Sequence, residues 1–253
     1  PRLEGGEGES ADPEAEAKLL LYPGESFYNL PRIADLGGEV PWVEQISWEP
    51  RAQVYHNFLT PQECNHLINL AAAHMKTSNV VDRTTGKSHA SNVRTSTGHF
   101  LLRDQDPTVT EIEERIAAFS MIPADHGEGM QILHYTEGQK YDPHFDYFQD
   151  QENVKNGGQR MATVLLYLSD VEAEGGGETI FPKGKFVHGD PGTPSYDHEA
   201  ASKLPGVTPC ARGKLHVKPR RGDALLFWST TMSGAADESS LHGGCPVRKG
   251  HKW

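Results

Sequence analysis

Residues 141–148 read Tyr-Asp-Pro-His-Phe-Asp-Tyr-Phe, and the rest of the chain is organised around this stretch. It contains a His-x-Asp pair, His144 and Asp146. Side chains two residues apart on a β-strand point to the same face of the sheet. One imidazole and one carboxylate therefore converge, and the pair predicts two ligands of a metal site.

A second histidine would complete a three-ligand set. The candidate is His242, in the segment Ser-Leu-His-Gly-Gly at residues 240–244. Two histidines and one carboxylate form the facial triad of non-haem Fe(II) oxygenases. The pair alone is weak evidence, because the chain has 13 histidines. A solvated strand or turn is the alternative interpretation.

Length, charge and cysteine content bound the function. The chain has 253 residues, enough for one large β-rich domain or two small ones. A formal net charge of -11 argues against a general nucleic-acid binder and suits a neutral or basic substrate. Cys64, Cys210 and Cys245 form no C-x-x-C motif, so we expect no structural zinc site. We find no apolar stretch of membrane-spanning length and no signal peptide.

The N-terminal segment differs in composition from the rest. Residues 1–17 contain six acidic side chains and one arginine, separated by glycine and alanine. Such low hydrophobicity with high charge predicts a disordered tail. The chain starts at Pro1, so we expect a processed or trimmed form. We divide it into an acidic, flexible segment over residues 1–45 and one domain over residues 46–253.

Two helices are predicted in the first half of that domain. Thr60, Pro61 and Glu63 form a capping box with proline in the first turn, and a second helix begins at Asp106. Apolar residues follow at helical spacing. The predicted buried stripes are Cys64, Leu67, Ile68, Ala71 and Met75 in the first helix, and Val109, Ile112, Ile116 and Phe119 in the second. Residues 76–98 between them are polar, which is typical of a long mobile loop, a hairpin or a lid.

Strands are predicted around residues 52–59, 130–135, 161–168, 178–181, 215–218 and 224–228. The run 161–168 is almost wholly apolar, so we expect it to be central and buried on both faces. His56 has no carboxylate at strand spacing and is interpreted as a packed strand histidine. Helices followed by short strands predict an α+β fold with a β-sandwich or jelly-roll core and flanking helices.

A 2-oxoglutarate-dependent oxygenase also needs a cation for the far carboxylate of that co-substrate. Lys252 lies ten residues after His242, and a turn at residues 249–250 would return it to a neighbouring strand. Arg248 and Lys249 are competing cations that spacing does not exclude. An ordinary exposed lysine is the other interpretation of Lys252.

The candidate residues stand within longer segments that match a known family. These segments are Trp48–Arg51, Val93–Ser96, Gly138–Tyr141, Asn156–Gly158, Gly176–Thr179, Lys218–Arg220 and Leu241–Val247. Together they resemble the catalytic domain of the plant and algal prolyl 4-hydroxylases over residues 46–253. Family members continue past the Lys-Trp pair, whereas this chain stops at Trp253, so Lys252 is expected near a chain end. The family's N-terminal membrane anchor is not seen here.

The resemblance implies a fold, a reaction and roles for residues. The fold would be a double-stranded β-helix, the jelly roll. His144, Asp146 and His242 would bind Fe(II), and Lys252 would bind the C5 carboxylate of 2-oxoglutarate. Hydroxyls of Tyr135 and Thr179 would assist Lys252. With O2 and L-ascorbate as further cofactors, the enzyme would convert 2-oxoglutarate to succinate and hydroxylate C4 of peptidyl proline.

The resemblance also implies a proline-rich, cell-wall-glycoprotein-like polypeptide as substrate. Such chains favour the polyproline II conformation, and Arg94, Tyr141 and Arg160 would line its groove. Surface ion pairs for the arginines and a packed strand tyrosine are the alternatives. His134 points away from Tyr135 and is interpreted as structural. A disulfide between Cys210 and Cys245, with Cys64 free, would fit the lumen of the endoplasmic reticulum or Golgi.

Three other functions remain open from the sequence. The chain could be a superfamily hydroxylase acting on lysine or a small molecule. It could also be a non-catalytic module that binds proline-rich peptides, although such a module would be expected to have lost a ligand. A jelly roll that holds zinc or manganese is the third, because sequence does not name the metal.

Overall fold

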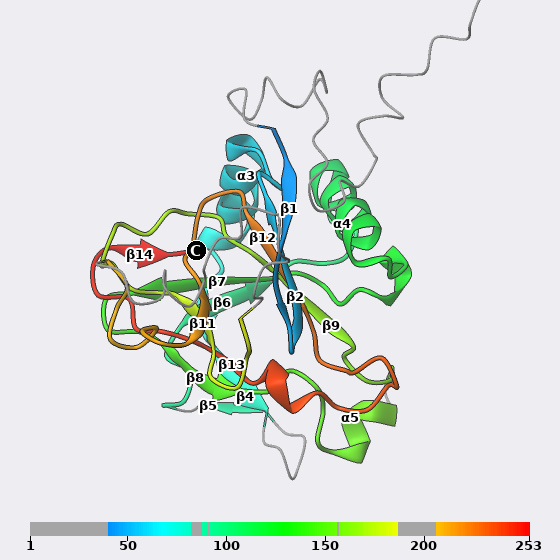
Figure 1. Ribbon diagram of the computed structural model, residues 1–253. Helices are drawn as coiled ribbons and strands as arrows, with labels where there is room; N and C mark the ends of the chain where they lie inside the picture. Colours follow the sequence, from blue (N-terminus) through cyan, green and yellow to red (C-terminus); the bar gives the residue numbers. More distant parts are fainter. Residues whose placement is uncertain (1–39, 82–87, 91, 156, 187–205) are drawn as a thin grey trace, which may run out of the picture.

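A computed structural model describes residues 40–81, 88–90, 92–155, 157–186 and 206–253 (Figure 1). Within these ranges no helix is both long and apolar enough to cross a lipid bilayer. The predicted tail over residues 1–17 lies outside the described residues. The division at residue 45 therefore stays a prediction, and the first described strand begins ahead of it, at Trp42.

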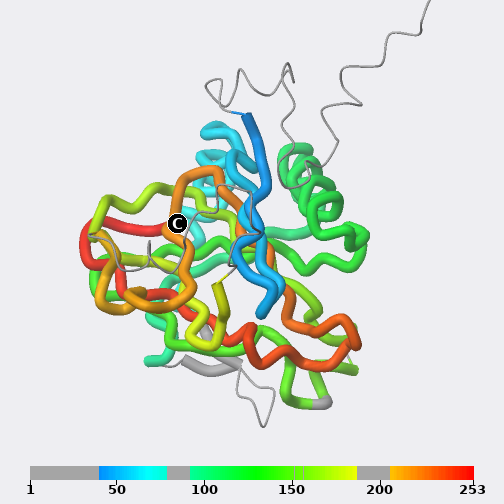
Figure 2. Tube along the Cα trace, in the orientation of Figure 1, coloured from blue at the N-terminus to red at the C-terminus, as the bar shows by residue number. Residues whose placement is uncertain are grey.

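The first sheet has the strand order β1-β2-β12-β9 and is antiparallel throughout. Its strands are β1 (Trp42–Trp48), β2 (Arg51–His56), β12 (Ala224–Trp228) and β9 (Ala162–Leu166). Figure 2 shows the blue start of the described chain beside the orange segment that contains β12. Four of the five β12 residues are buried, as expected for a strand with a partner on each side.

The second sheet, β11-β10-β13-β8, contains the segments that matter for the site. It consists of β11 (Leu215–Val217), β10 (Thr179–Phe181), β13 (His242–Gly244) and β8 (Tyr141–His144). β13 pairs antiparallel with β8, and His242 lies opposite His144. Two glycines allow β13 to approach β8 closely: a Cβ at Gly243 would stand 3.0 Å from the carbonyl oxygen of Tyr141.

A third sheet, β14-β7-β6-β3, joins the chain end to the middle of the sequence. Its strands are β14 (His251–Lys252), β7 (Gln131–Thr136), β6 (Thr97–Phe100) and β3 (Lys76–Thr77). β4 (Asn79–Val81) and β5 (Ser88–Ala90) form a separate hairpin. The hairpin interpretation of residues 76–98 is thus confirmed, with residues 82–87 and 91 outside the described ranges. Movement of this segment as a lid stays a prediction.

Helices α3 (Pro61–Ala72) and α4 (Pro107–Ser120) lie at the top of Figure 1. Both predicted helix starts are confirmed: Thr60 and Glu63 form the predicted capping box, and the Asp106 side chain caps the second helix by accepting from the Val109 amide. Arg115 of α4 pairs with Glu63 of α3 at 2.7 Å. Short helices are α5 (Gln151–Lys155), η1 (Ala124–His126) and η2 (Glu238–Ser240).

The main core lies between these helices and the first sheet. It includes the predicted stripe residues Cys64, Leu67, Ala71, Val109, Ile112 and Phe119, together with Tyr55 and Leu226 from the sheet. Met75 lies beyond the end of α3, and Ile116 is only partly buried. Antiparallel sheets with a few helices confirm the α+β layout.

One strand prediction is wrong in part. β9 exists, but it stands at the end of its sheet, and all five of its residues are half-buried. The expectation of a central strand buried on both faces fails because, among the described strands, β9 pairs on one side only, with β12, and because its residues line a cavity. β1 was not predicted, since Pro and Gly breaks obscure the pattern in residues 18–47.

Candidate active site

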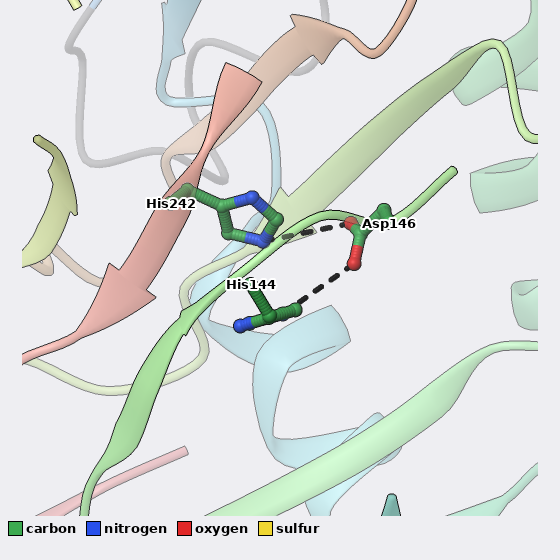
Figure 3. Close-up of side chains that lie close together, drawn as sticks. All are labelled: His144, Asp146 and His242. Carbon is green, nitrogen blue, oxygen red and sulfur yellow. Dashed lines mark ion pairs between the residues drawn. The ribbon is translucent and has the colours of Figure 1, made fainter. Parts of the chain in front are cut away.

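Three predicted ligands meet at one point between β8 and β13 (Figure 3). Nε2 of His144 lies 3.5 Å from Oδ1 of Asp146, and Nε2 of His242 lies 3.6 Å from Oδ2. Candidate ligand atoms of the three residues lie within 4.8 Å of one another. One atom from each can therefore face a single ion, and two imidazoles with a carboxylate are the donor set suited to Fe(II).

The route by which Asp146 reaches this point differs from the prediction. β8 ends at His144, and Asp146 lies in the bend that follows. Only His144 lies on β8, so a shared strand face does not explain how Asp146 reaches the site. What brings the two histidines together is cross-strand pairing, because His242 is the partner of His144 on β13.

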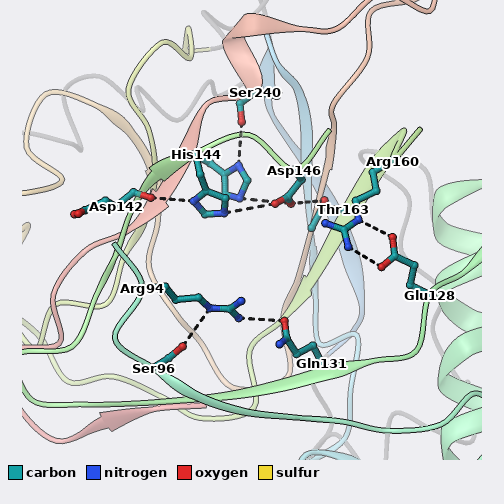
Figure 4. Close-up of polar contacts among 11 residues, drawn as sticks. Arg94, Ser96, Glu128, Gln131, Asp142, His144, Asp146, Arg160, Thr163 and Ser240 are labelled. Atoms are coloured by element: carbon teal, nitrogen blue, oxygen red, sulfur yellow. Dashed lines mark hydrogen bonds and ion pairs between the residues drawn. The ribbon is translucent and has the colours of Figure 1, made fainter. Parts of the chain in front are cut away.

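Backbone carbonyls orient both histidine rings (Figure 4). Nδ1 of His144 contacts the Asp142 carbonyl at 2.9 Å, and Nδ1 of His242 contacts the Ser240 carbonyl at 3.0 Å. A carbonyl oxygen only accepts, so each Nδ1 must carry the hydrogen that it donates. The lone pair is then on Nε2, which faces Asp146. Both rings are in the tautomer that a metal ligand requires.

The electrostatics favour the same protonation state. Burial lowers the pKa of His242 to about 4, so its ring is neutral near pH 7. Burial opposes ionisation of Asp146, but its contacts with His242 and His144 and the hydrogen bond from Thr163 outweigh this effect and lower the pKa of that carboxyl. An anionic carboxylate beside two imidazole rings is a donor set that can accept a divalent cation.

Lys252 reaches the same cavity from β14. Lys252 is the cross-strand partner of Tyr135 on β7, and its ammonium donates to the Gly177 carbonyl at 2.8 Å. The ammonium lies 5.8 Å from the ring centre of Tyr135 and 5.4 Å from that of Tyr167. Burial lowers the pKa of Lys252 to about 8, and the charge of Glu178 partly offsets this effect. A lysine has three donors, so this cation fits a ligand carboxylate.

The competing cations lie elsewhere. Arg248 and Lys249 are both exposed, and Lys249 pairs with Glu172 at 2.6 Å. The predicted turn is present, with Gly250 at φ 76° before β14. After this turn Lys252, but neither Arg248 nor Lys249, lines the cavity that contains the candidate ligand histidines.

Thr179, the other predicted co-substrate residue, is buried at the start of β10. Its hydroxyl accepts a hydrogen bond of 2.9 Å from the hydroxyl of Tyr167. The sequence reasoning did not name Tyr167, which is 2% exposed and lies just after β9. A tyrosine inside an apolar run was an available signal, since a buried tyrosine hydroxyl needs a polar partner.

All three predicted substrate residues line the cavity that holds the ligands, whose volume is about 2290 Å³. Arg94 is buried, donates to Ser96 and Gln131, and has its guanidinium 4.9 Å from the ring centre of Tyr141. The Tyr141 ring stacks on that of His144 at 3.6 Å.

The third residue of this set, Arg160, forms a two-point ion pair with Glu128, with N–O distances of 2.6 and 2.8 Å. Figure 4 shows Arg94 and Arg160 in the same view as the ligand cluster. The ion pair expected as the alternative for Arg160 is thus present, but at the cavity wall.

Two other histidines have structural positions, as predicted. The His134 ring stacks on Trp253 at 4.0 Å. His56 lies between Asp223 at 2.8 Å and Glu44 at 3.1 Å. Glu44 lies on β1 and Asp223 immediately precedes β12, so spacing along one strand did not reveal either partner. Burial alone would lower the pKa of His56, but the hydrogen bonds and charges of both carboxylates raise it to about 9.

The cysteines are arranged as the resemblance implied. Cys210 and Cys245 form a disulfide with a Cα–Cα distance of 5.9 Å. Cys64 is free and buried in α3. The bridge connects β13's C-terminal end with the segment that precedes β11.

Comparison with known proteins adds the family. Residues 130–253 match the sequence profile of the 2OG-Fe(II) oxygenase superfamily. Probable prolyl 4-hydroxylase 10 of Arabidopsis thaliana is 58% identical over 212 residues, which cover 84% of this chain and 69% of that protein. Prolyl 4-hydroxylase 5 of the same plant is 54% identical over 212 residues, with 84% and 69% covered.

Among solved structures, the fold resembles viral collagen prolyl hydroxylase from Paramecium Bursaria Chlorella virus-1, determined as its 2OG complex. The TM-score is 0.52 at 23% sequence identity, and the match covers 79% of this chain and 91% of that chain. This likeness supports the fold, and the plant relatives support the family. The identity and coverage of those relatives place the chain in the prolyl 4-hydroxylase family, within the 2-oxoglutarate- and Fe(II)-dependent dioxygenases.

Proposed function

We propose that this protein hydroxylates C4 of peptidyl proline in proline-rich polypeptides and converts 2-oxoglutarate to succinate. The observation that carries the proposal is the position of Lys252 in the same cavity as His144, Asp146 and His242. One cavity thus offers a metal-binding set and a cation for a dicarboxylate, in a chain whose plant relatives are named prolyl 4-hydroxylases.

The two histidines and Asp146 would hold Fe(II). When bound, the iron supplies O2 activation coupled to decarboxylation of 2-oxoglutarate. The chain's own contribution is to hold three ligand atoms on one side of the ion and to leave the other side open. The two carbonyl contacts of the histidine Nδ1 atoms keep the rings in position before the metal arrives.

Lys252 would bind the C5 carboxylate of 2-oxoglutarate, with Tyr135 and Thr179 assisting. A partly buried ammonium whose pKa is lowered by burial gains from a carboxylate partner, because the partner restores the interactions lost with water. The hydroxyl of Thr179 already accepts from Tyr167, so its own hydrogen is available to a ligand oxygen. We assign the sheets β1-β2-β12-β9 and β11-β10-β13-β8 to the two faces of a jelly roll.

Arg94, Tyr141 and Arg160 would contact the polypeptide. A polyproline II chain has no internal hydrogen bonds, so its carbonyls need external donors and its rings suit aromatic surfaces. Arg94 is a buried donor beside the Tyr141 ring, and that ring stacks on His144. A substrate proline at this position would lie next to the metal. The preference for cell-wall-glycoprotein-like sequences is part of the same proposal.

We also propose that the protein works in the lumen of the endoplasmic reticulum or Golgi with L-ascorbate as a cofactor. The disulfide between Cys210 and Cys245 supports an oxidising compartment. The first test is to reduce this disulfide and to measure the melting temperature. A lower melting temperature would support a requirement for an oxidising compartment.

Two alternatives are separated by one assay. The Fe(II)-loaded protein is incubated with 2-oxoglutarate, with and without a proline-rich peptide, and succinate, the peptide mass and peptide binding are measured. Peptide-stimulated succinate with one added oxygen on proline supports the proposal. Succinate without peptide modification favours a hydroxylase of another substrate. Peptide binding without succinate would favour a non-catalytic module and contradict the proposal.

A further inference from the structure

The proposed metal ligands lie in one sheet or directly after one of its strands, but two side chains that contact these ligands come from another sheet. His144 and His242 belong to the β11-β10-β13-β8 sheet, and Asp146 follows β8. Strands β9 and β12 of the β1-β2-β12-β9 sheet provide Thr163 and Phe227, which are direct cross-strand partners. Directly opposite residues of an antiparallel pair project from the same face. Their side chains can therefore approach the ligand cluster together.

Thr163 contacts the carboxylate ligand. Its Oγ1 donates to Oδ2 of Asp146 at 2.6 Å, and Figure 4 shows the two side chains facing each other. Hydrogen bonds from a hydroxyl to an ionised carboxylate are short and stronger than neutral ones. Asp146 lies beyond the end of β8, so no strand pairing fixes it. The hydroxyl supplies a constraint that the local backbone lacks.

Phe227 contacts one of the histidine ligands. Its ring centre lies 4.5 Å from that of His242, at an angle of 54°. The side chain is fully buried, and it also packs edge-on against Phe181. One cross-strand pair therefore supports two of the three ligands, Asp146 by a hydrogen bond and His242 by packing.

We infer that Thr163 is a positioning residue for the metal site. Its hydroxyl occupies one lone pair of Asp146 Oδ2 and so sets the plane of the carboxylate before the ion binds. The inference rests on the proposed function, because it assumes that Asp146 is a metal ligand. It goes beyond that proposal by assigning the geometry of this ligand to a residue on the facing sheet.

A purely structural role for Thr163 makes a different prediction. Threonine suits a half-buried strand because it is β-branched, and valine suits the same position equally well. Valine has nearly the same shape but no donor. Thr163→Val would therefore leave a structural role intact and remove a positioning role. Thr163→Ser does the opposite, since it keeps the hydroxyl and loses the methyl group.

The test is a Co(II) titration of the metal-free protein, followed by visible absorption, which needs neither catalysis nor substrate. Outer-shell partners of metal ligands typically contribute 10–100-fold in affinity. We expect Thr163→Val to weaken Co(II) binding by about 10–100-fold, and Thr163→Ser to stay close to wild type. Thr110→Val is the matched control, because Thr110 donates its hydroxyl to the Asp106 carbonyl in α4, outside the cavity.

The outcomes separate this inference from the proposed function. If the wild-type protein binds Co(II) and Thr163→Val binds it equally well, the positioning role is overturned while the metal site stands. If the wild-type protein binds no Co(II), the proposed metal site is wrong and the inference falls with it. Should Thr163→Val fail to fold, Thr163→Ala lacks the same donor. Wild-type Co(II) affinity in that variant would also overturn the inference.

Discussion

Lys252 gives the most informative perturbation, because its charge is predicted to change within an accessible pH range. Burial lowers its pKa from 10.5 to about 8. With that value, about one tenth of the side chains are neutral at pH 7 and half are neutral at pH 8. Only the ammonium form attracts a carboxylate. Binding of 2-oxoglutarate should therefore be nearly constant below pH 7 and weaken as the pH rises through 8.

The magnitude follows from proton linkage. When the ligand binds only the protonated form, its apparent affinity falls up to about tenfold for each pH unit above the pKa of the free protein. Between pH 7 and pH 9 the dissociation constant of 2-oxoglutarate should rise by about tenfold. Lys252→Arg keeps its charge throughout this range, so its constant should be higher but independent of pH. Lys252→Ala removes one partner of a buried charge pair, which costs at least about 2 kcal/mol or about 30-fold.

The assay measures 2-oxoglutarate affinity from pH 6 to pH 9.5 by calorimetry on the Co(II)-loaded protein. Wild type, Lys252→Arg and Lys252→Ala are compared, and Lys249→Ala is the control, because Lys249 pairs with Glu172 at the surface. A wild-type affinity that stays flat to pH 9.5 would refute the argument from burial. Normal affinity in Lys252→Ala would refute the assignment of Lys252 itself.

Three further predictions concern metal binding and stability. Asp146→Ala should lose Co(II) binding and turnover, and retention of either would exclude this carboxylate as a ligand. The pKa of His56 is about 9 in the folded protein and 6.5 in the unfolded chain. Its contacts with Asp223 and Glu44 should therefore stabilise the fold fully below pH 6.5, and this stabilisation should be lost as the pH rises through 9. In urea unfolding, His56→Gln should remove this pH dependence from the free energy of unfolding. Cys245→Ala opens a bridge across a separation of 35 residues and should lower the free energy of unfolding by about 3–4 kcal/mol, and an unchanged melting temperature would contradict this.

Local signals in the sequence predict much of the fold. The helix starts at Thr60 and Asp106 and most positions of the two buried helix stripes depend on residues a few positions apart, and the structure confirms them. Boundaries of β12 also agree with the predicted run 224–228. β9 is an example of what such local signals do not predict. An apolar run looks the same whether its face meets a second layer or a cavity, so only the assembled fold tells which applies.

The site was predictable to the extent that it depends on recognisable segments. His144, Asp146, His242 and Lys252 were identified from motifs, and the structure places all four around one cavity. Tyr167 was missed because its partner, Thr179, lies twelve residues away across a turn. The carboxylate partners of His56 were missed for the same physical reason, since Glu44 lies on β1 and Asp223 lies just before β12.

The contact between Thr163 and Asp146 is another one that the sequence alone does not reveal. Seventeen residues separate them in sequence, and no local periodicity relates a strand residue to a bend that follows a different strand. The contact exists because β9 pairs with β12, and because Phe227, opposite Thr163, packs on His242. A slip of one residue between β9 and β12 would turn the Thr163 hydroxyl to the other face. With the role proposed for Thr163, the register of the β1-β2-β12-β9 sheet would set the geometry of a metal site whose proposed ligands that sheet does not contain.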